Sequence, residues 1–70
     1  MEVGNNLKVM RFNKTQITQE ELAKQVNVTR QTIHAIETGK FNPSVKLALL
    51  LADFFHCKVE DIFYLNKKED

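Results

Sequence analysis

The sequence predicts a small all-α domain of five short helices, and three observations support this fold class. The 70 residues include only 2 Gly and 1 Pro, which leaves little material for the tight turns of β-hairpins. Apolar residues recur at helical spacing in several stretches, and Thr18, Thr29 and Ser44 stand just before such stretches, where N-cap residues are favoured. A chain of this length has material for one core. We therefore expect one domain over residues 1–70, with its core in about residues 5–65.

The first predicted helix begins after Asn5 or Asn6, either of which can cap it, and runs to about Lys14. Leu7 and Met10 are three residues apart, so they share one face of this helix and point toward the core. Residues 15–17 then form a connector.

The second predicted helix opens with a capping box. The hydroxyl of Thr18 is placed to accept from the backbone N–H of Glu21, whose carboxylate can reach back to the Thr18 N–H. Leu22 and Val26 stand four residues apart and mark the buried face. Asn27 follows as a residue that tolerates the left-handed conformation in which helices often end.

The third predicted helix is capped by Thr29 and ended by Gly39. Ile33 and Ile36 are three residues apart and give this helix a core-facing side.

The fourth helix follows a loop at residues 41–43 and is capped by Ser44. Its apolar residues cover more than one side, which is typical of a central core helix. Residues 59–64 form a short fifth helix, and two acids near its start suit the positive end of the helix dipole. The charged tail at residues 66–70 is expected to fray.

The second and third helices are joined so tightly that they must cross steeply. The second helix ends near Gln25 and the third begins after Thr29, and a turn of three or four residues gives a crossing of about 90–120°. The backbones come close at such a crossing, so Ala23 has the size that the geometry permits. Asn27 lets the chain reverse with a positive φ at small steric cost. This arrangement is a helix-turn-helix.

The outward side of the third helix carries side chains that can read bases in the major groove. Arg30 can fork onto guanine, and Gln31 can pair with adenine through two hydrogen bonds. His34 could contact a base, a phosphate or neither. The candidate base-reading residues are Arg30, Gln31, His34 and Ala35. The candidate phosphate-contacting residues are Gln19, Thr29, Thr32, Thr38, Lys40, Asn42 and Ser44.

The stretches "TQEELAKQVNVTRQTIHAIETGKFNPS", "LALLLADFF" and "VEDIFYL" together resemble the Cro/cI-type helix-turn-helix regulators, also called the xenobiotic-response-element family. The resemblance covers about residues 5–65. It implies a five-helix, lambda-repressor-like DNA-binding domain that regulates transcription. By position, Gln19 resembles the family's phosphate-contacting Gln, and residues 40–44 resemble the loop that clamps the DNA backbone.

The resemblance also implies one ion pair and contains one length difference. Arg11 matches the first-helix Arg that pairs with the Glu at position 37. An anion facing DNA would be repelled, so we expect Glu37 to have a structural role, held either by this cation or by loop amides. The connector "NKTQI" is one residue longer than usual. His56 stands where the family often has Gly, so it is expected in left-handed geometry, and Leu50 is expected to leave an apolar spot on the surface.

The charge is unevenly distributed, although the net charge is only +1. Residues 1–47 contain seven Lys/Arg and four acids, and residues 48–70 contain three Lys and five acids, so the first part carries +3 and the second −2. A mildly positive surface therefore lies on the part with the helix-turn-helix. The single Cys cannot form an internal disulfide, and no signal peptide or membrane-spanning run is evident, so we expect a cytoplasmic protein.

Other classes of function find little support in the sequence. No catalytic constellation or phosphate-binding Gly loop is present, so we expect no enzyme, no cofactor and no small-molecule ligand. His56 and Cys57 are adjacent but lack a second pair at zinc spacing, so no metal site is expected, and Cys57 is interpreted as a small buried apolar residue.

The expected partner is an operator in double-stranded DNA. A homodimer would read two half-sites about 34–36 Å apart, and repression is the favoured outcome. We expect its interface on the fifth helix and the C-terminal residues. Five apolar residues could form either core or such an interface: Leu50, Phe55, Phe63, Tyr64 and Leu65. The alternative function is a protein-interaction module, such as an antitoxin or adaptor, that uses the fourth and fifth helices.

Overall fold

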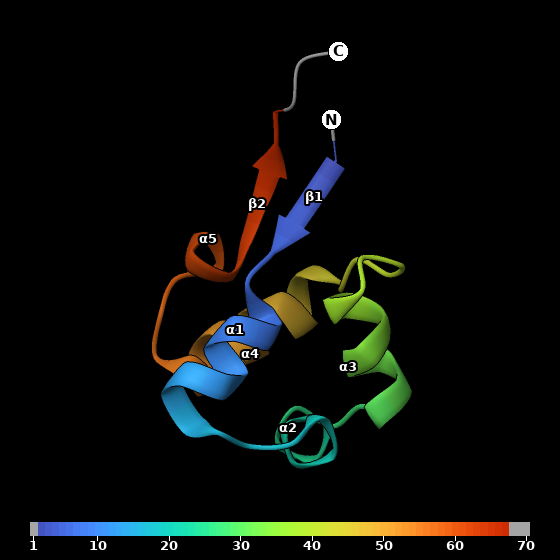
Figure 1. Cartoon of the computed structure of the whole chain (residues 1–70), viewed down its shortest axis with the longest axis vertical. Helices are drawn as coiled ribbons and strands as arrows, with labels where there is room; N and C mark the ends of the chain where they lie inside the picture. Colours follow the sequence, from blue (N-terminus) through green and yellow to red (C-terminus); the bar gives the residue numbers. More distant parts are fainter. Residues whose placement is uncertain (1, 68–70) are drawn as a thin grey trace.

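The computed structural model describes residues 2–67 and contains five α-helices and a small two-stranded sheet (Figure 1). The order along the chain is β1 (Glu2–Asn5), α1 (Leu7–Met10), the π-helical segment η1 (Arg11–Thr15), α2 (Gln19–Gln25), α3 (Arg30–Glu37), α4 (Val45–Phe55), α5 (Val59–Ile62) and β2 (Phe63–Asn66). The predicted helical class is thus confirmed, and the sheet is an addition to it.

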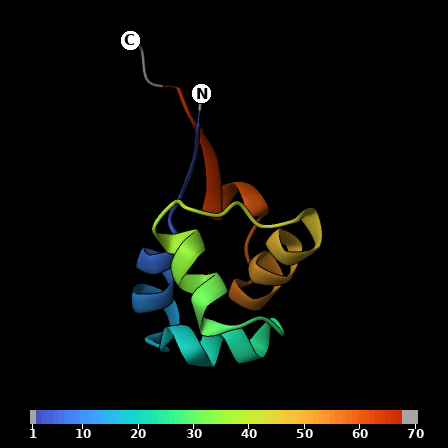
Figure 2. The same ribbon diagram turned by 90° about the vertical axis from the view of Figure 1, so that its right-hand side faces the viewer.

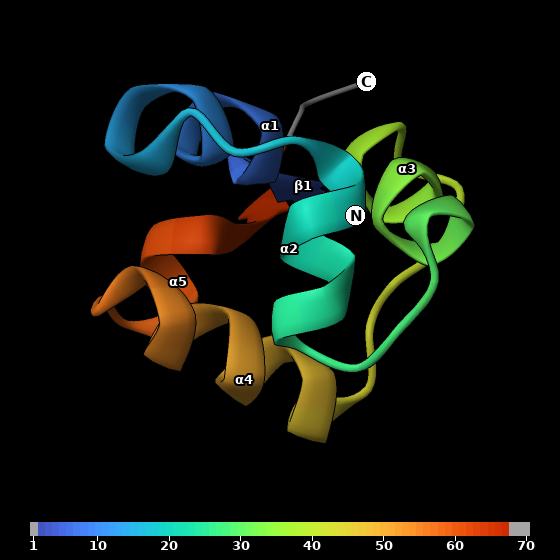
Figure 3. The same ribbon diagram turned by 90° about the horizontal axis from the view of Figure 1, so that it is seen from below.

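The helices enclose one apolar core, and the two strands form a ribbon that projects from the end of the molecule opposite α2 (Figure 1). Seen from below, α1 and α4 lie on opposite sides, with α2 between them (Figure 3). Every helix contributes to the core. Its buried apolar residues are Leu7, Met10, Leu22, Ala23, Val26, Ile33, Ile36, Leu47, Leu51, Ala52, Phe55 and Ile62.

The first predicted helix is confirmed in extent, but its second half is a π-helix. The N–H of Gln16 donates to the carbonyl of Arg11 at 2.7 Å, which closes a turn wider than that of an α-helix. The capping differs from expectation: Asn6 is the N-cap residue, but its side chain makes no capping bond to α1. Asn5 Oδ1 accepts from the N–H of Leu7 instead, at 3.1 Å.

The predicted caps of the later helices are confirmed. Thr18 and Glu21 form the capping box, with backbone-to-side-chain distances of 2.8 and 3.1 Å. The hydroxyls of Thr29 and Ser44 accept from backbone N–H groups three residues ahead, at 3.2 and 3.1 Å. Asn27 has φ 61°, as predicted for the turn.

The end of the chain differs from the prediction, because α5 ends at Ile62 and residues 63–66 form β2. β2 pairs antiparallel with β1, and Asn66, predicted to fray, stands opposite Glu2. The scarcity of Gly and Pro argued only against hairpins, and these strands come from opposite ends of the chain, so they need no hairpin turn. Aromatic residues at positions 63 and 64 also favour strand over helix. The rest of the predicted tail, residues 68–70, lies outside the described residues.

The ribbon is attached to the helices at its base. The N–H of Asn6 donates to the carbonyl of Ile62 at 2.8 Å, and Asn5 Nδ2 donates to the carbonyl of Ile36 at 2.9 Å. The second bond links β1 to the last turn of α3. Farther along the ribbon, Gly4 stands opposite Tyr64, and the Tyr64 ring occupies the space that a Cβ at Gly4 would need.

Several predictions about single residues in the C-terminal part can be checked directly. Phe55 is 3% exposed, so of the two roles left open for it the core role is confirmed and the interface role is excluded. Leu50 is exposed and His56 has φ 55°, both as predicted. Cys57 is half-buried and packs against the core, and burial raises the pKa of its thiol.

Among residues 2–67, no helix is long and apolar enough to cross a membrane.

Candidate nucleic-acid interface

Helices α2 and α3 pack directly against each other across the four residues 26–29. Ala23, on α2, is 2% exposed, and its carbonyl accepts from the N–H of Val28 at 3.0 Å. A larger side chain at position 23 would have no room in this contact, which confirms the size argument from the sequence. Figure 2 shows α3 in front, α2 crossing below it, and the loop after α3 passing above it.

The predicted base-reading residues on the outward side of α3 differ in their exposure. Arg30, Gln31 and His34 are exposed, while Ile33 and Ile36 are buried on the opposite side. Arg30 and Gln31 occupy the first turn of the helix, which is the end that inserts most readily into a major groove. Ala35 is half-buried, and its carbonyl accepts from the N–H groups of Lys40 and Phe41 at 2.9 and 3.2 Å. Its methyl group offers only a small apolar contact surface, of the kind that suits a thymine methyl.

Gln19 connects α2 to this reading surface. Its Nε2 donates to Glu37 Oε1 at 3.0 Å and lies 3.3 Å from Nδ1 of His34. Its Oε1 accepts a long hydrogen bond of 3.5 Å from Arg30 Nη1. The single amide thus touches two of the exposed residues on α3, and the sequence predicted only a phosphate contact for it.

The carboxylate of Glu37 is held from the other side by Arg11. Arg11 Nε donates to Oε2 at 2.8 Å and Nη2 donates to Oε1 at 3.2 Å, while Nη1 donates to the carbonyl of Ile17 at 2.9 Å. The two side chains are only 7% and 2% exposed. A forked, almost fully enclosed pair of this kind neutralises the Glu37 charge and fixes its position. The structural role predicted for Glu37, and its pairing with Arg11, are both confirmed.

The hydroxyl groups of the candidate phosphate-contacting residues differ in whether their hydrogen is free to donate to a DNA phosphate. Ser44 Oγ accepts from the N–H of Leu47, so its own hydrogen is free for a DNA phosphate. Thr38 Oγ1 lies within hydrogen-bond distance of the carbonyls of His34 and Ala35, at 3.0 and 3.3 Å, so its hydrogen is already used. Thr29 and Thr32 lie 3.1 Å apart through their hydroxyls, and one hydrogen of that pair is committed to the other oxygen.

The loop after α3 supplies the remaining phosphate candidates. Lys40 and Asn42 are both exposed, and no hydrogen bond involving either side chain occurs among the described residues. An exposed ammonium on a loop beside the reading helix is suited to a phosphate, because counterion release there favours binding.

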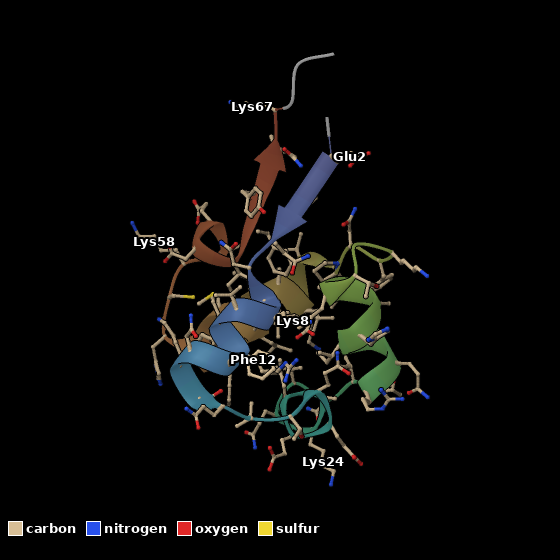
Figure 4. The ribbon with its side chains drawn as sticks, in the orientation of Figure 1. Glu2, Lys8, Phe12, Lys24, Lys58 and Lys67 are labelled. Atoms are coloured by element: carbon tan, nitrogen blue, oxygen red, sulfur yellow. The ribbon has the colours of Figure 1, made fainter. Side chains whose placement is uncertain are left out.

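One aromatic residue near the surface escaped the sequence analysis. Phe12 is 53% exposed, and the Arg11 guanidinium lies 4.9 Å from the centre of its ring. Figure 4 shows Phe12 between η1 and α2, and it lines one open hollow together with Gln19 and Arg30. The aromatic face beside Arg11 adds a cation–π contact to the ion pair.

Within the described part of the chain, no group of three or more His, Cys, Asp or Glu side chains could hold a metal ion. His56 and Cys57 are therefore not part of such a group in residues 2–67. The exposed groups of the site include hydrogen-bond donors and cations, which suit binding to a polyanion.

Two crossed helices, α2 and α3, lie in front of an enclosed ion pair, and α3 exposes Arg30 and Gln31. This arrangement defines a helix-turn-helix DNA-binding domain. Residues 12–62 match the helix-turn-helix family HTH_3, and the chain belongs to this family of Cro/cI-type regulators. It is a DNA-binding transcriptional regulator. Both strands of the ribbon lie outside the matched residues.

Several proteins of similar sequence have been named as regulators. An uncharacterized HTH-type transcriptional regulator of Methanocaldococcus jannaschii, MJ0272, is 57% identical over 53 residues, which are 76% of this chain and 80% of that protein. One from Archaeoglobus fulgidus is 54% identical over 56 residues, covering 80% of this chain and 79% of the relative. The control protein C.MunI of Mycoplasma sp is 43% identical over 42 residues, with 60% and 57% covered.

Proposed function

We propose that this protein is a homodimeric repressor that recognises its operator through α3 and acts by DNA binding alone, in the cytoplasm and without a cofactor. The observation that carries the proposal is the exposure of Arg30 and Gln31 on the first turn of α3, a helix that packs against α2. Arg30 would contact guanine and Gln31 adenine, each through two hydrogen bonds to the base edge. His34 and Ala35 would contact the neighbouring base pairs.

The phosphate contacts we propose surround this helix. Gln19 begins α2, Thr29 caps the start of α3, and Lys40 and Ser44 stand beyond the other end of α3. Each cation that meets a phosphate releases a counterion, so these contacts would add affinity without sequence preference. Thr32 and Asn42 belong to the same set, and Thr38 would join it by exchanging its hydrogen bond to the backbone carbonyls of α3 for one to a phosphate.

The proposed dimer face comprises α5 and the ribbon, and we call it the α5–ribbon face. Val3, Tyr64 and Leu65 are exposed there by 39%, 45% and 56%. The same residues line one open hollow with Glu60 and Lys67, so the rim of the apolar patch carries one charge of each sign. A two-fold axis could bring each Glu60 to the partner's Lys67, as an isologous interface requires. Such a dimer would place two copies of α3 on half-sites about 34–36 Å apart.

Repression is proposed because a bound dimer denies the same DNA to other proteins, and this needs only the binding surface already described. One relative of similar sequence is named a control protein.

The test is selection of bound DNA from a random pool at two salt concentrations, for the wild type and for Arg30→Ala and Gln31→Ala. We expect a two-fold symmetric site, and each substitution should cost about 1–3 kcal/mol at one base position in each half. Lys40→Ala should weaken binding to all sequences and reduce the slope of log K against log salt by about 1 for each bound subunit.

Lys58→Ala is the matched control, because Lys58 is exposed on the side of the molecule away from α3 (Figure 4). It should leave both affinity and sequence preference unchanged. If Arg30→Ala and Gln31→Ala leave binding at every site unchanged, α3 is not the reader, and a protein-interaction function becomes the better explanation.

A further inference from the structure

Helix α4 carries a second exposed apolar surface, on the side that faces away from the core. Five residues share this surface, which we call the α4 stripe: Val45, Lys46, Leu49, Leu50 and Asp53. They line one open hollow, and the exposed fractions of Val45, Leu49 and Leu50 are 77%, 56% and 36%. The stripe shares no residue with the outward side of α3 or with the α5–ribbon face.

The exposure of these residues is not required by the fold. The buried side of α4 is complete without them, since Leu47, Leu51, Ala52 and Phe55 are the residues that enter the core. A single exposed Leu is ordinary, but adjacent apolar side chains on successive turns of one helix are typical of an interaction surface.

The charges on the stripe are arranged so that it complements itself. Lys46 and Asp53 stand at equal distances, about 5 Å along the helix axis, from the midpoint between Leu49 and Leu50. If two copies of α4 lie antiparallel about a two-fold axis at that midpoint, each Lys46 is level with the partner's Asp53. Leu49 of one copy then faces Leu50 of the other. No acid or base on the stripe is left opposite a like charge.

We propose that the α4 stripe is a self-association surface through which two copies of this chain pair antiparallel, α4 against α4. The two-fold arrangement covers the exposed apolar side chains and forms two Lys46–Asp53 ion pairs between the copies. This pairing depends neither on DNA binding nor on the dimer proposed above.

The size of the stripe determines how strong this association is. Three apolar side chains on one 11-residue helix bury much less than the roughly 800 Å² per partner of a standard stable interface. The pairing is therefore weak in dilute solution. It becomes populated where copies are concentrated, and for a DNA-binding protein this condition is met when two assemblies are bound at nearby sites.

The test is sedimentation equilibrium over a range of protein concentration, without DNA. It compares the wild-type chain with three further samples. These are Lys46→Glu, Asp53→Lys and an equimolar mixture of the two variants. In either variant alone, like charges face each other in both pairs, so the association constant should fall by about tenfold or more. In the mixture each pair contains opposite charges again, so association should return to about the wild-type level.

Controls separate this surface from general charge effects and from misfolding. Lys8→Glu changes the same charge on α1, on the opposite side of the molecule (Figures 3 and 4), and Glu20→Lys makes the reverse change on α2. Both controls should associate like the wild type. Leu49→Ser removes exposed apolar surface without touching a charge, and it should weaken association while leaving the urea unfolding midpoint unchanged.

Three results would overturn the proposal. The first is a wild-type mass that never exceeds that of Lys46→Glu at any attainable concentration. The second is a mixture that associates no better than its two components. The third is equal weakening by Lys8→Glu, which would show that net charge, and not the stripe, controls association.

Discussion

The guanidinium of Arg11 and the carboxylate of Glu37 form a forked ion pair across 26 residues of sequence, and their side chains are 7% and 2% exposed. The pair joins the start of η1 to the last residue of α3. Gln19 completes it, because its amide donates to the same carboxylate. The recognition helix is therefore positioned by charges that the solvent hardly reaches.

This geometry predicts a strong and asymmetric effect on stability. Arg11→Met leaves the carboxylate of Glu37 enclosed without its cation, so we expect a loss of about 3–5 kcal/mol in the free energy of unfolding. Arg11→Met with Glu37→Leu removes both charges and should recover most of that loss. Urea unfolding followed by circular dichroism measures both. A double variant as unstable as the single one would contradict this account of the ion pair.

Gln19 offers a test of positioning as distinct from folding. Its hydrogen bonds are partly exposed, so Gln19→Ala should change the free energy of unfolding by about 1 kcal/mol or less. The affinity for the selected operator should fall by about tenfold or more, because a phosphate contact and the alignment of Arg30 are both lost. Base preference at the Arg30 position should also relax, which loss of a phosphate contact alone would not cause. Gln25→Ala, exposed on the same helix, is the control and should bind DNA normally.

The close contact between Gly4 and the Tyr64 ring predicts that the cost of a substitution at position 4 depends on the side chain at position 64. Gly4→Ala places a methyl group where the Tyr64 ring lies, so the ring must move and the ribbon should lose about 1 kcal/mol. In a Tyr64→Ser background the same substitution meets open space, and its cost should disappear. A double-mutant cycle from thermal or urea unfolding gives the coupling. Equal costs in both backgrounds would show that the ring does not occupy this space.

The thiol of Cys57 should react slowly at neutral pH. Burial raises its pKa, and nearby Asp61 adds to the increase, while Lys14 opposes it. Because only the thiolate reacts with iodoacetamide, the rate should reach half of its maximum at a higher pH than for Cys in a short peptide. Lys14→Gln removes the opposing charge and should move that midpoint still higher. The rates are followed by mass spectrometry, and a midpoint at or below that of the peptide would contradict the prediction.

Much of the fold was predictable because its signals are local. Thr18, Thr29 and Ser44 each cap a helix through a hydrogen bond three residues ahead, so a short window of sequence contains the whole interaction. The turn at Asn27 and the small residue at Ala23 follow from the four-residue separation of two helices. The pairing of Arg11 with Glu37 came from the family resemblance, because no local pattern connects them.

The features that the sequence did not predict depend on contacts between distant residues. β1 and β2 have no turn between them, and no local pattern pairs Glu2 with Asn66. The triple role of the Gln19 amide requires Glu37, His34 and Arg30 to be brought around it, which only the packed structure does. For Phe55, the sequence showed an apolar residue at the end of α4 but not which way its ring points.

The ribbon also constrains when the molecule can be completed during synthesis. The partner of β1 is made after all the helices, since Glu2 pairs with Asn66. Helices α1 to α4 can begin to pack once α4 has emerged from the ribosome, whereas the first strand must wait, unpaired, until residues 63–66 have followed. Closing so long a loop is also the slowest kind of contact to form. The reading helix thus forms before the ribbon. The Asn5–Ile36 hydrogen bond then forms late, to a helix that is already in place.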